Sequence, residues 1–483
     1  MSGSAPLPDS FTAARRSDEP FWQRQERRIQ GSTGQPCCTL SGISTGLIAM
    51  EGDFAVVIHG EDECAACFLH YGPSSHRFFC TGLTEKHFVT GQTAEPLRRC
   101  LRLLCEEVHP SAILVLGACP IEVIGDRFEE VVEDVADEYP HVPMRALHTS
   151  GLKVGSQAAM TDWMFSTLVG LPPRPPVDPR WRRQVGDAGF DMVEAFITLS
   201  PEELLAAHKQ ASALLRPPPL EPSRCINFIG MPAAVDLGGF VPEWTALLER
   251  IGVIVTGDFP GAATLDDWRG ITHAAATFVV DRSLYPRTVK TLEDGGQTVV
   301  DIDLPVGIGP TERFYETIGT VLGLEDEVTA VIAEAKAAAE AIAADFASER
   351  GGLRVAMGLR QLNNYRPDQL AQHGLGDYAA LSELGFDITL MVQGPPEKRD
   401  KFARLFALRG ITTPFEVFPE PWSLSKHLGG GRFDVAYMAD HCRGEARKAG
   451  VPLMVSRMLC PGFAGVARNA RVIRQQLEQE VRR

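Results

Sequence analysis

The chain has 483 residues, 44% of them hydrophobic and 23% charged, which is typical of a soluble globular protein with room for about three domains. Its net charge of −15 offers no basic face to a nucleic acid, and no apolar run approaches the roughly 20 residues that span a membrane. The first 30 residues contain no signal-peptide core. We therefore expect a cytoplasmic protein whose 11 cysteines are metal ligands or buried small side chains rather than disulfides.

Residues 1–34 form a polar leader, and from residue 35 onward apolar runs alternate with amphipathic stretches. Helical patterns at residues 93–108 and 128–138 separate the first of these runs. Strands that alternate with helices predict an α/β protein with doubly wound parallel sheets. The predicted strands are 55–59, 112–116, 225–229, 253–256, 276–280, 298–302, 355–357, 388–392, 434–438 and 451–455.

Two proline-rich segments, residues 171–176 and 216–219, cannot continue a helix or a central strand. The second lies directly before a predicted strand and marks a domain boundary. Residues 325–350 are rich in alanine and glutamate and predict a long helix that ends at Gly351. We therefore expect an N-terminal domain over 35–220, a second domain over 221–345 and a C-terminal domain over 346–483.

Three cysteines lie in distinct local motifs. Cys38 lies in Gln-Pro-Cys-Cys-Thr, Cys64 closes His-Gly-Glu-Asp-Glu-Cys, and Cys119 lies in Gly-Ala-Cys-Pro-Ile-Glu-Val-Ile-Gly-Asp. Cys64 and Cys119 each follow a predicted buried strand, at 55–59 and 112–116. Open α/β sheets bind ligands at the carboxyl ends of their strands, and soft thiolates select iron–sulfur clusters, zinc or copper(I). The motifs predict metal or redox chemistry; three buried structural cysteines are the alternative.

The order and spacing of these motifs resemble the N-terminal domain of nitrogenase component 1 subunits. That family shows a first Cys, then His-Gly-x-x-x-Cys, then a segment similar to residues 83–91, then Cys-(Pro/Met)-x-x-(Val/Leu)-Ile-Gly-Asp. The resemblance is specific over residues 35–165 and implies three Rossmann-like domains around a central cleft. It also implies that Cys38, Cys64 and Cys119 supply half the ligands of an iron–sulfur cluster, of P-cluster-like 8Fe-7S or of 4Fe-4S type.

The same resemblance implies the partners. The cluster would be shared with a homologous subunit in an α2β2 heterotetramer, and electrons would arrive from a separate ATP-hydrolysing iron–sulfur reductase. This chain has no phosphate-binding loop motif, so ATP hydrolysis belongs to that other protein.

Several neighbouring residues leave alternatives open. Cys37 could replace Cys38 as a ligand, although the spacing of Cys38 to His59 resembles the family better. Cys64 and Cys67 form a C-x-x-C, a weak zinc signal without a second such pair. His59 could donate to a sulfur, shuttle protons or satisfy a backbone carbonyl. The remaining cysteines of this region, Cys80, Cys100 and Cys105, are interpreted as packing residues.

One departure from the family concerns a second metallocofactor. Nitrogenase α-subunits hold it with a Cys after a second-domain strand and a His near the C-terminus. The matching residues 278–283 contain no Cys here, and the His position falls near Pro461. Cys460 is the candidate thiolate ligand, Cys442 is another, and a buried structural role is the alternative for both. The departure implies a β-like subunit or an enzyme with different cofactor anchoring.

The sequence therefore predicts a subunit of a nitrogenase-like, ATP-dependent reductase. Carbon–sulfur bond reduction in methylthio-alkanes is favoured as its reaction over reduction of dinitrogen or of a tetrapyrrole. A non-catalytic scaffold for nitrogenase cofactor assembly is the rival function. A small-molecule binder with incidental cysteines is a third possibility.

Overall fold

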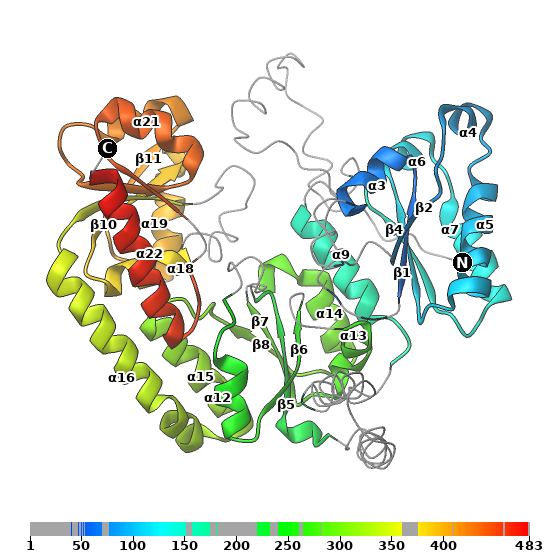
Figure 1. The fold of residues 1–483 in the computed structure, drawn as a ribbon, viewed down its shortest axis with the longest axis horizontal. Helices are drawn as coiled ribbons and strands as arrows, with labels where there is room; N and C mark the ends of the chain where they lie inside the picture. The colour runs from blue at the N-terminus through cyan, green and yellow to red at the C-terminus, as the bar shows by residue number, and fades with distance from the viewer. Residues whose placement is uncertain are drawn as a thin grey trace, which may run out of the picture.

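In the computed structural model, the chain folds into three β-sheets with helices packed beside them (Figure 1). All strand pairs of the described residues are parallel, which confirms the predicted α/β fold with three parallel sheets. The described residues are 40, 47, 50, 52, 54–69, 77–150, 157–173, 180, 220–231, 240–259, 264–280, 282–359, 375–408, 410–456 and 459–481.

The first sheet has the strand order β2-β1-β3-β4. Its strands are β1 (Ala55–His59), β2 (Phe78–Cys80), β3 (Ile113–Gly117) and β4 (Met144–His148). The helices of this region are α3 (Asp62–Leu69), α4 (Glu85–Thr90), α5 (Ala94–Leu103), which continues into a π-helical turn (Leu104–Val108), α6 (Cys119–Ile124), α7 (Phe128–Glu138) and α9 (Gln157–Val169). The chain moves outward from β1 to β2 and then returns to β3 on the other side of β1. The strand order therefore reverses between β1 and β3, which is where open α/β sheets bind ligands.

The second sheet repeats this arrangement with the order β6-β5-β7-β8. Its strands are β5 (Cys225–Ile229), β6 (Ile254–Phe259), β7 (Ala276–Val280) and β8 (Val299–Ile302). Its helices are α12 (Trp244–Arg250), α13 (Leu265–Gly270), α14 (Pro286–Asp294) and α15 (Ile308–Leu322).

The third sheet has the order β11-β10-β9-β12-β13, the strand order of a dinucleotide-binding fold. Its strands are β9 (Arg354–Gly358), β10 (Asp387–Gln393), β11 (Phe415–Phe418), β12 (Val435–Met438) and β13 (Leu453–Val455). Its helices are α18 (Leu375–Glu383), α19 (Arg399–Leu408), α20 (Leu424–Leu428), α21 (Arg443–Ala449) and α22 (Phe463–Val481).

Helix α16 (Glu325–Arg350) joins the second sheet to the third and has the predicted bounds. Its first turn carries three acidic residues, which favour the positive end of the helix dipole. Apolar side chains at helical spacing, from Val328 to Phe346, are buried in a core that residues of both sheets share. Figure 1 shows α16 beside α15 and α22, which it contacts. The second and third units are therefore packed as one continuous core.

The predicted strands agree with the structure where they are central and buried. Every predicted run overlaps an observed strand, and β1, β5 and β7 have the predicted bounds and are buried at all five positions. Strands β2, β4 and β11 were not predicted. All three lie at sheet edges; β2 has only three residues, and the charged residues Arg145 in β4 and Glu416 in β11 interrupt the apolar pattern of those strands.

Two carboxylates, of which Asp162 is buried and Glu383 half-buried, connect the units at helix N-termini. Asp162 on α9 accepts hydrogen bonds from the backbone N–H groups of Arg287 and Thr288 on α14, each at 2.9 Å. Glu383 on α18 accepts from the N–H groups of Ile308 at 2.5 Å and Gly309 at 2.8 Å, in the first turn of α15. These N–H groups have no partner within their own helix, so a carboxylate from another unit is an effective cap. The caps hold the three units in a fixed relation.

The predicted leader and domain boundaries stay predictions. The leader lies outside the described residues, and the strands of the three sheets span residues 55–148, 225–302 and 354–455. Among the described helices, none combines the length and apolarity needed to cross a bilayer.

Candidate metal-binding edge of the first sheet

Cys64 and Cys119 lie at the same edge of the first sheet, on either side of its reversal point. Cys64 is in the first turn of α3, directly after β1, and Cys119 opens α6, directly after β3. The two strands are neighbours in register, with His59 opposite Gly117. Both thiol-bearing residues are half-buried. The sheet topology therefore brings together two cysteines that are 55 positions apart in the sequence.

Small residues allow this edge to be compact. A Cβ on Gly60 would lie 2.6 Å from the Cβ of Ala118, the residue before Cys119, and 3.9 Å from the Sγ of Cys64. Only glycine permits so close an approach of the two turns. Pro120 lies in the first turn of α6, where its missing N–H breaks no helix bond. The turns that carry Cys64 and Cys119 are thus in direct contact.

Helix α6 is anchored by its own acidic residues. The Nδ1 atom of His148, at the end of β4, lies 2.5 Å from the Oε1 atom of Glu122. Asp126, just past the helix, accepts a hydrogen bond from the hydroxyl of Thr93. These contacts attach the middle and the C-terminal end of the Cys119 motif to the rest of the domain. The Glu-Val-Ile-Gly-Asp portion of the motif therefore has a structural role in orienting α6.

His59 is fully buried beneath this edge. Its Nδ1 atom lies 3.1 Å from the hydroxyl oxygen of Thr81, and its Nε2 atom has no hydrogen-bond partner among the described residues. Burial lowers the pKa of His59 to about 4, against a smaller opposite effect of Asp126. His59 is therefore a neutral imidazole that bonds to a hydroxyl, rather than to the sulfur or backbone carbonyl considered from the sequence.

A pH dependence follows from this buried histidine. Because its folded-state pKa lies below the ordinary 6.5, the unfolded chain binds an extra proton between pH 6.5 and 4. Stability should be complete above pH 6.5 and fall by about 3 kcal/mol as the pH drops to 4. Urea unfolding of His59→Gln should show a flatter pH dependence over this window. The exposed His141→Gln is the control, and an unchanged slope in His59→Gln would contradict the assignment.

The third predicted ligand, Cys38, and its alternative, Cys37, lie outside the described residues, as does the side chain of Cys67. Within the described part of the chain, no three His, Cys, Asp or Glu side chains form a group that could hold a metal ion. Cys105 is buried and Cys100 packs against the same apolar cluster, as expected for packing residues. Cys80 packs against a different apolar core, which Cys64 also contacts, and makes the polar contacts described below.

The candidates for a second cofactor lie in the third unit. Cys460 follows β13 and is 4% exposed; its N–H and carbonyl both bond to the side-chain amide of Asn469, at 2.8 and 2.9 Å. Cys442 follows β12, and burial raises the pKa of its thiol to about 11. The structure thus places both at the carboxyl edge of the third sheet, in a different sheet from Cys64 and Cys119.

The second-unit position that lacks a cysteine is built around an ion-pair network. Arg282, just after β7, bonds to Asp301 at 2.9 Å and to Glu293 at 2.6 Å. The guanidinium group is thereby held against its own sheet. Arg282 therefore has a structural role at the position where a cofactor cysteine was considered.

The first-sheet edge has part of the donor chemistry that an iron–sulfur cluster uses. It presents two sulfur atoms on adjoining turns, a close approach at Gly60 and a buried imidazole, one nitrogen of which has no partner in the part of the chain that the structure describes. Thiolate ligands on rigid supports, close to backbone N–H groups, are the usual setting of such clusters. The two described cysteines of this edge fit the chemistry of such a group.

Comparison with known proteins agrees with this geometry. A profile of the family described as nitrogenase component 1 type oxidoreductase matches residues 38–470. The nitrogenase iron-molybdenum cofactor biosynthesis protein NifE of Klebsiella pneumoniae is 23% identical over 339 residues, which cover 67% of this chain and 66% of that protein.

Solved structures show the same fold. Nitrogenase Cp1 at pH 6.5 superposes with a TM-score of 0.63 and 15% identity over 92% of both chains. Nitrogenase Cp1 at pH 5 gives a TM-score of 0.62 and 17% identity over 92% of this chain and 89% of that one. With two motif cysteines at the reversal point of the first sheet and a family match over most of its length, the chain belongs to the nitrogenase component 1 type oxidoreductase family.

Proposed function

We propose that this chain is a subunit of the catalytic component of a nitrogenase-like, ATP-dependent reductase. In this proposal Cys38, Cys64 and Cys119 provide half the ligands of an iron–sulfur cluster, of 8Fe-7S or 4Fe-4S type, shared with a homologous subunit. When bound, the cluster would relay electrons towards a substrate-reducing site. The observation that carries the proposal is the position of Cys64 and Cys119 on adjoining turns at the reversal point of the first sheet.

An exposed apolar patch beside Cys119 supports an interface at this edge. Val123 and Ile124 on α6 are 68% and 44% exposed, and Val89 on α4 is 79% exposed. Helices α4 and α6 contact each other, so these side chains lie on neighbouring elements. Grouped exposed apolar side chains are characteristic of protein–protein contacts. We assign this patch, Val89, Val123 and Ile124, to contact with other proteins of the complex.

The favoured reaction is reduction of a carbon–sulfur bond in a methylthio-alkane, with dinitrogen and a tetrapyrrole as alternatives. The preference is supported by residues 278–283, which lack the cofactor cysteine of nitrogenase α-subunits and instead carry the Arg282 ion-pair network. The test is turnover by the purified complex, supplied with its reductase, ATP and each substrate class in separate assays. Reduction of a methylthio-alkane alone is the expected result.

A scaffold for metallocofactor assembly is the second candidate function. The similarity to NifE, a cofactor biosynthesis protein by name, favours it. A scaffold would bind and transfer a cofactor without turning over any substrate. Transfer of radiolabelled iron from the purified complex to a cofactor-free nitrogenase-like acceptor, with no substrate reduction, would select this function over the first.

The third-unit cysteines provide a separate prediction. If this chain holds a second metallocofactor, Cys460 is the proposed anchor. Cys460→Ser should then lower activity strongly and remove only part of the iron of the assembled complex. If Cys460 is only a buried structural residue, the Cys460→Ser substitution should instead lower the free energy of unfolding by at most a few kcal/mol. Activity and metal content, measured on the same preparation, distinguish the two roles of Cys460. The control is Cys225→Ser, which changes a buried cysteine of β5. Full activity in Cys460→Ser would exclude Cys460 from the cofactor site.

A further inference from the structure

The segment that follows β2 braces the turn that carries Cys64. Strands β1 and β2 are paired in parallel, with Ile58 opposite Cys80, so residues 80–83 run alongside the turn after β1. The backbone N–H of Thr81 donates to the carbonyl of Ile58 at 3.1 Å, and that of Leu83 donates to the carbonyl of Gly60 at 2.9 Å. The turn is thus hydrogen-bonded to β2's continuation on one side, while Ala118 touches it on the other.

Side chains of this segment add to the brace. The hydroxyl oxygen of Thr81 accepts a hydrogen bond from the backbone N–H of Gly60 at 3.1 Å and pairs with His59 Nδ1 at the same distance. The thiol of Cys80 reaches the carbonyl oxygens of Gly60 at 3.6 Å and Glu61 at 3.5 Å. Its sulfur also accepts from the N–H of Gly82 at 3.5 Å.

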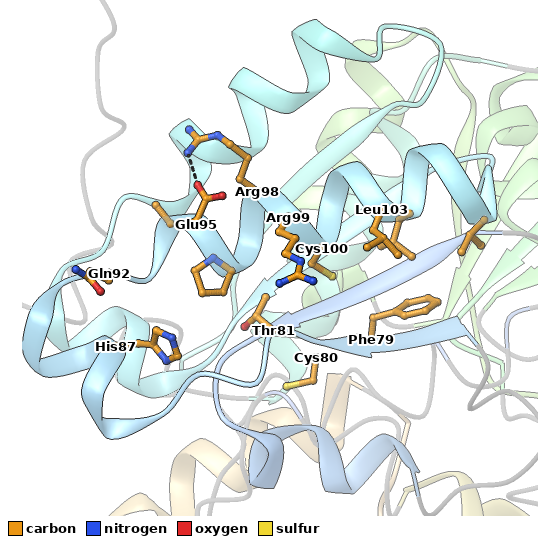
Figure 2. A pocket seen from close by; sticks show the side chains of 14 residues that line it. Phe79, Cys80, Thr81, His87, Gln92, Glu95, Arg98, Arg99, Cys100 and Leu103 are labelled. Carbon is orange, nitrogen blue, oxygen red and sulfur yellow. Dashed lines mark ion pairs between the residues drawn. The ribbon is translucent and has the colours of Figure 1, made fainter.

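One acceptor links Cys80 to Cys64. The carbonyl of Glu61 receives both the Cys80 thiol and, at 3.0 Å, the backbone N–H of Cys64 itself. Figure 2 shows the sulfur of Cys80 pointing away from Arg99 and Cys100 on α5, although all three residues line one surface pocket of about 930 Å³. The thiol is therefore directed at the turn and not at the helix on the other side of the pocket.

We infer that Cys80 is a positioning residue for Cys64. Its thiol acts as a donor that fixes the Gly60–Glu61 carbonyls, and through them the start of α3 and the direction of the Cys64 side chain. In this inference Cys80 acts on the turn and is not a cluster ligand, since its sulfur is directed at the backbone of the turn that carries Cys64. The inference rests on the proposed role of Cys64 as a ligand.

The first test needs no bound cluster. In Cys80→Ala the turn loses its thiol contacts, and amide hydrogen exchange in residues 58–64 should become about five-fold faster, the factor that one net hydrogen bond contributes. Cys80→Ser, which keeps a donor and an acceptor, should recover most of the protection. Cys100→Ala removes a thiol from the same pocket wall without touching the turn and should leave exchange in residues 58–64 unchanged.

The second test uses the assembled complex purified without oxygen. Cys80→Ala should lose less iron than Cys64→Ala and should shift the reduction potential and the EPR signal of the cluster, and Cys80→Ser should lie closer to wild type. Equal iron loss in both variants would make Cys80 a ligand and overturn the inference. Wild-type exchange and potential in Cys80→Ala would also overturn it. A wild-type complex without iron would instead overturn the proposed function, whatever the exchange data show.

Discussion

Cys64→Ala is expected to lose most of the iron of the purified complex, and Cys119→Ala and Cys38→Ala are expected to do the same. Removal of a group that merely orients a metal ligand costs about 10–100-fold in metal affinity, so removal of the ligand itself should cost more. Because metal binding is coupled to folding and assembly, the subunit interface should weaken together with the iron loss. Iron and acid-labile sulfide, with EPR spectra of anaerobic preparations, are the measurements.

Two cysteines outside the proposed site serve as controls. Cys225 is 1% exposed within β5 of the second sheet, and Cys100 packs on α5 away from the turn of Cys64. Cys225→Ala and Cys100→Ala should retain iron, so any general effect of losing a buried thiol is accounted for. Unchanged iron in all three ligand variants would end the cluster proposal.

Expressed alone, the chain is expected to be unstable or aggregated, and with its homologue it is expected to form an α2β2 heterotetramer. Two physical reasons support this result. In the proposed cluster, three cysteines from one chain would leave some irons without thiolates, and without a partner the patch of Val89, Val123 and Ile124 would stay exposed to water. Size-exclusion chromatography and native mass spectrometry of both preparations test it; a well-behaved monomer filled with iron would contradict it.

A pair of matched substitutions separates the patch from general surface effects. Val123→Asp places a charge beside Cys119, where a partner would bury it, and should abolish or strongly weaken assembly. Val321 is also an exposed valine on a helix, at 37% exposure, but it lies on α15 of the second unit. Val321→Asp should assemble normally, and equal assembly of both variants would exclude the patch from the interface.

Two candidate roles, a reductase subunit and a scaffold for cofactor assembly, follow from the comparisons with known proteins. Membership in the nitrogenase component 1 type family establishes kinship with oxidoreductases, while the similarity to NifE keeps an assembly role in view. In our proposal both roles use the thiolates of Cys64 and Cys119 at the edge of the first sheet. Substrate turnover therefore separates them where metal content does not.

The sequence by itself determined the buried centre of each sheet and the positions of the cysteine motifs. Central parallel strands such as β1, β5 and β7 are buried on both faces, so they are continuous apolar runs whose bounds can be predicted. Helix α16 was equally predictable, since its alanine and glutamate content and its glycine end are local signals. Edge strand β2 was missed because it has only three residues, and β4 and β11 were missed because Arg145 and Glu416 interrupt their apolar pattern.

Only the tertiary structure decided which residues surround the cysteines. The contact of Gly60 with Ala118 and the bonds of Cys80 and Thr81 to the Cys64 turn depend on the pairing of β1 with β2 and β3. Strand pairing joins segments that are distant in sequence, and no local pattern encodes the register. For that reason Cys80 looked like a packing residue in the sequence, although its thiol contacts the turn that carries Cys64.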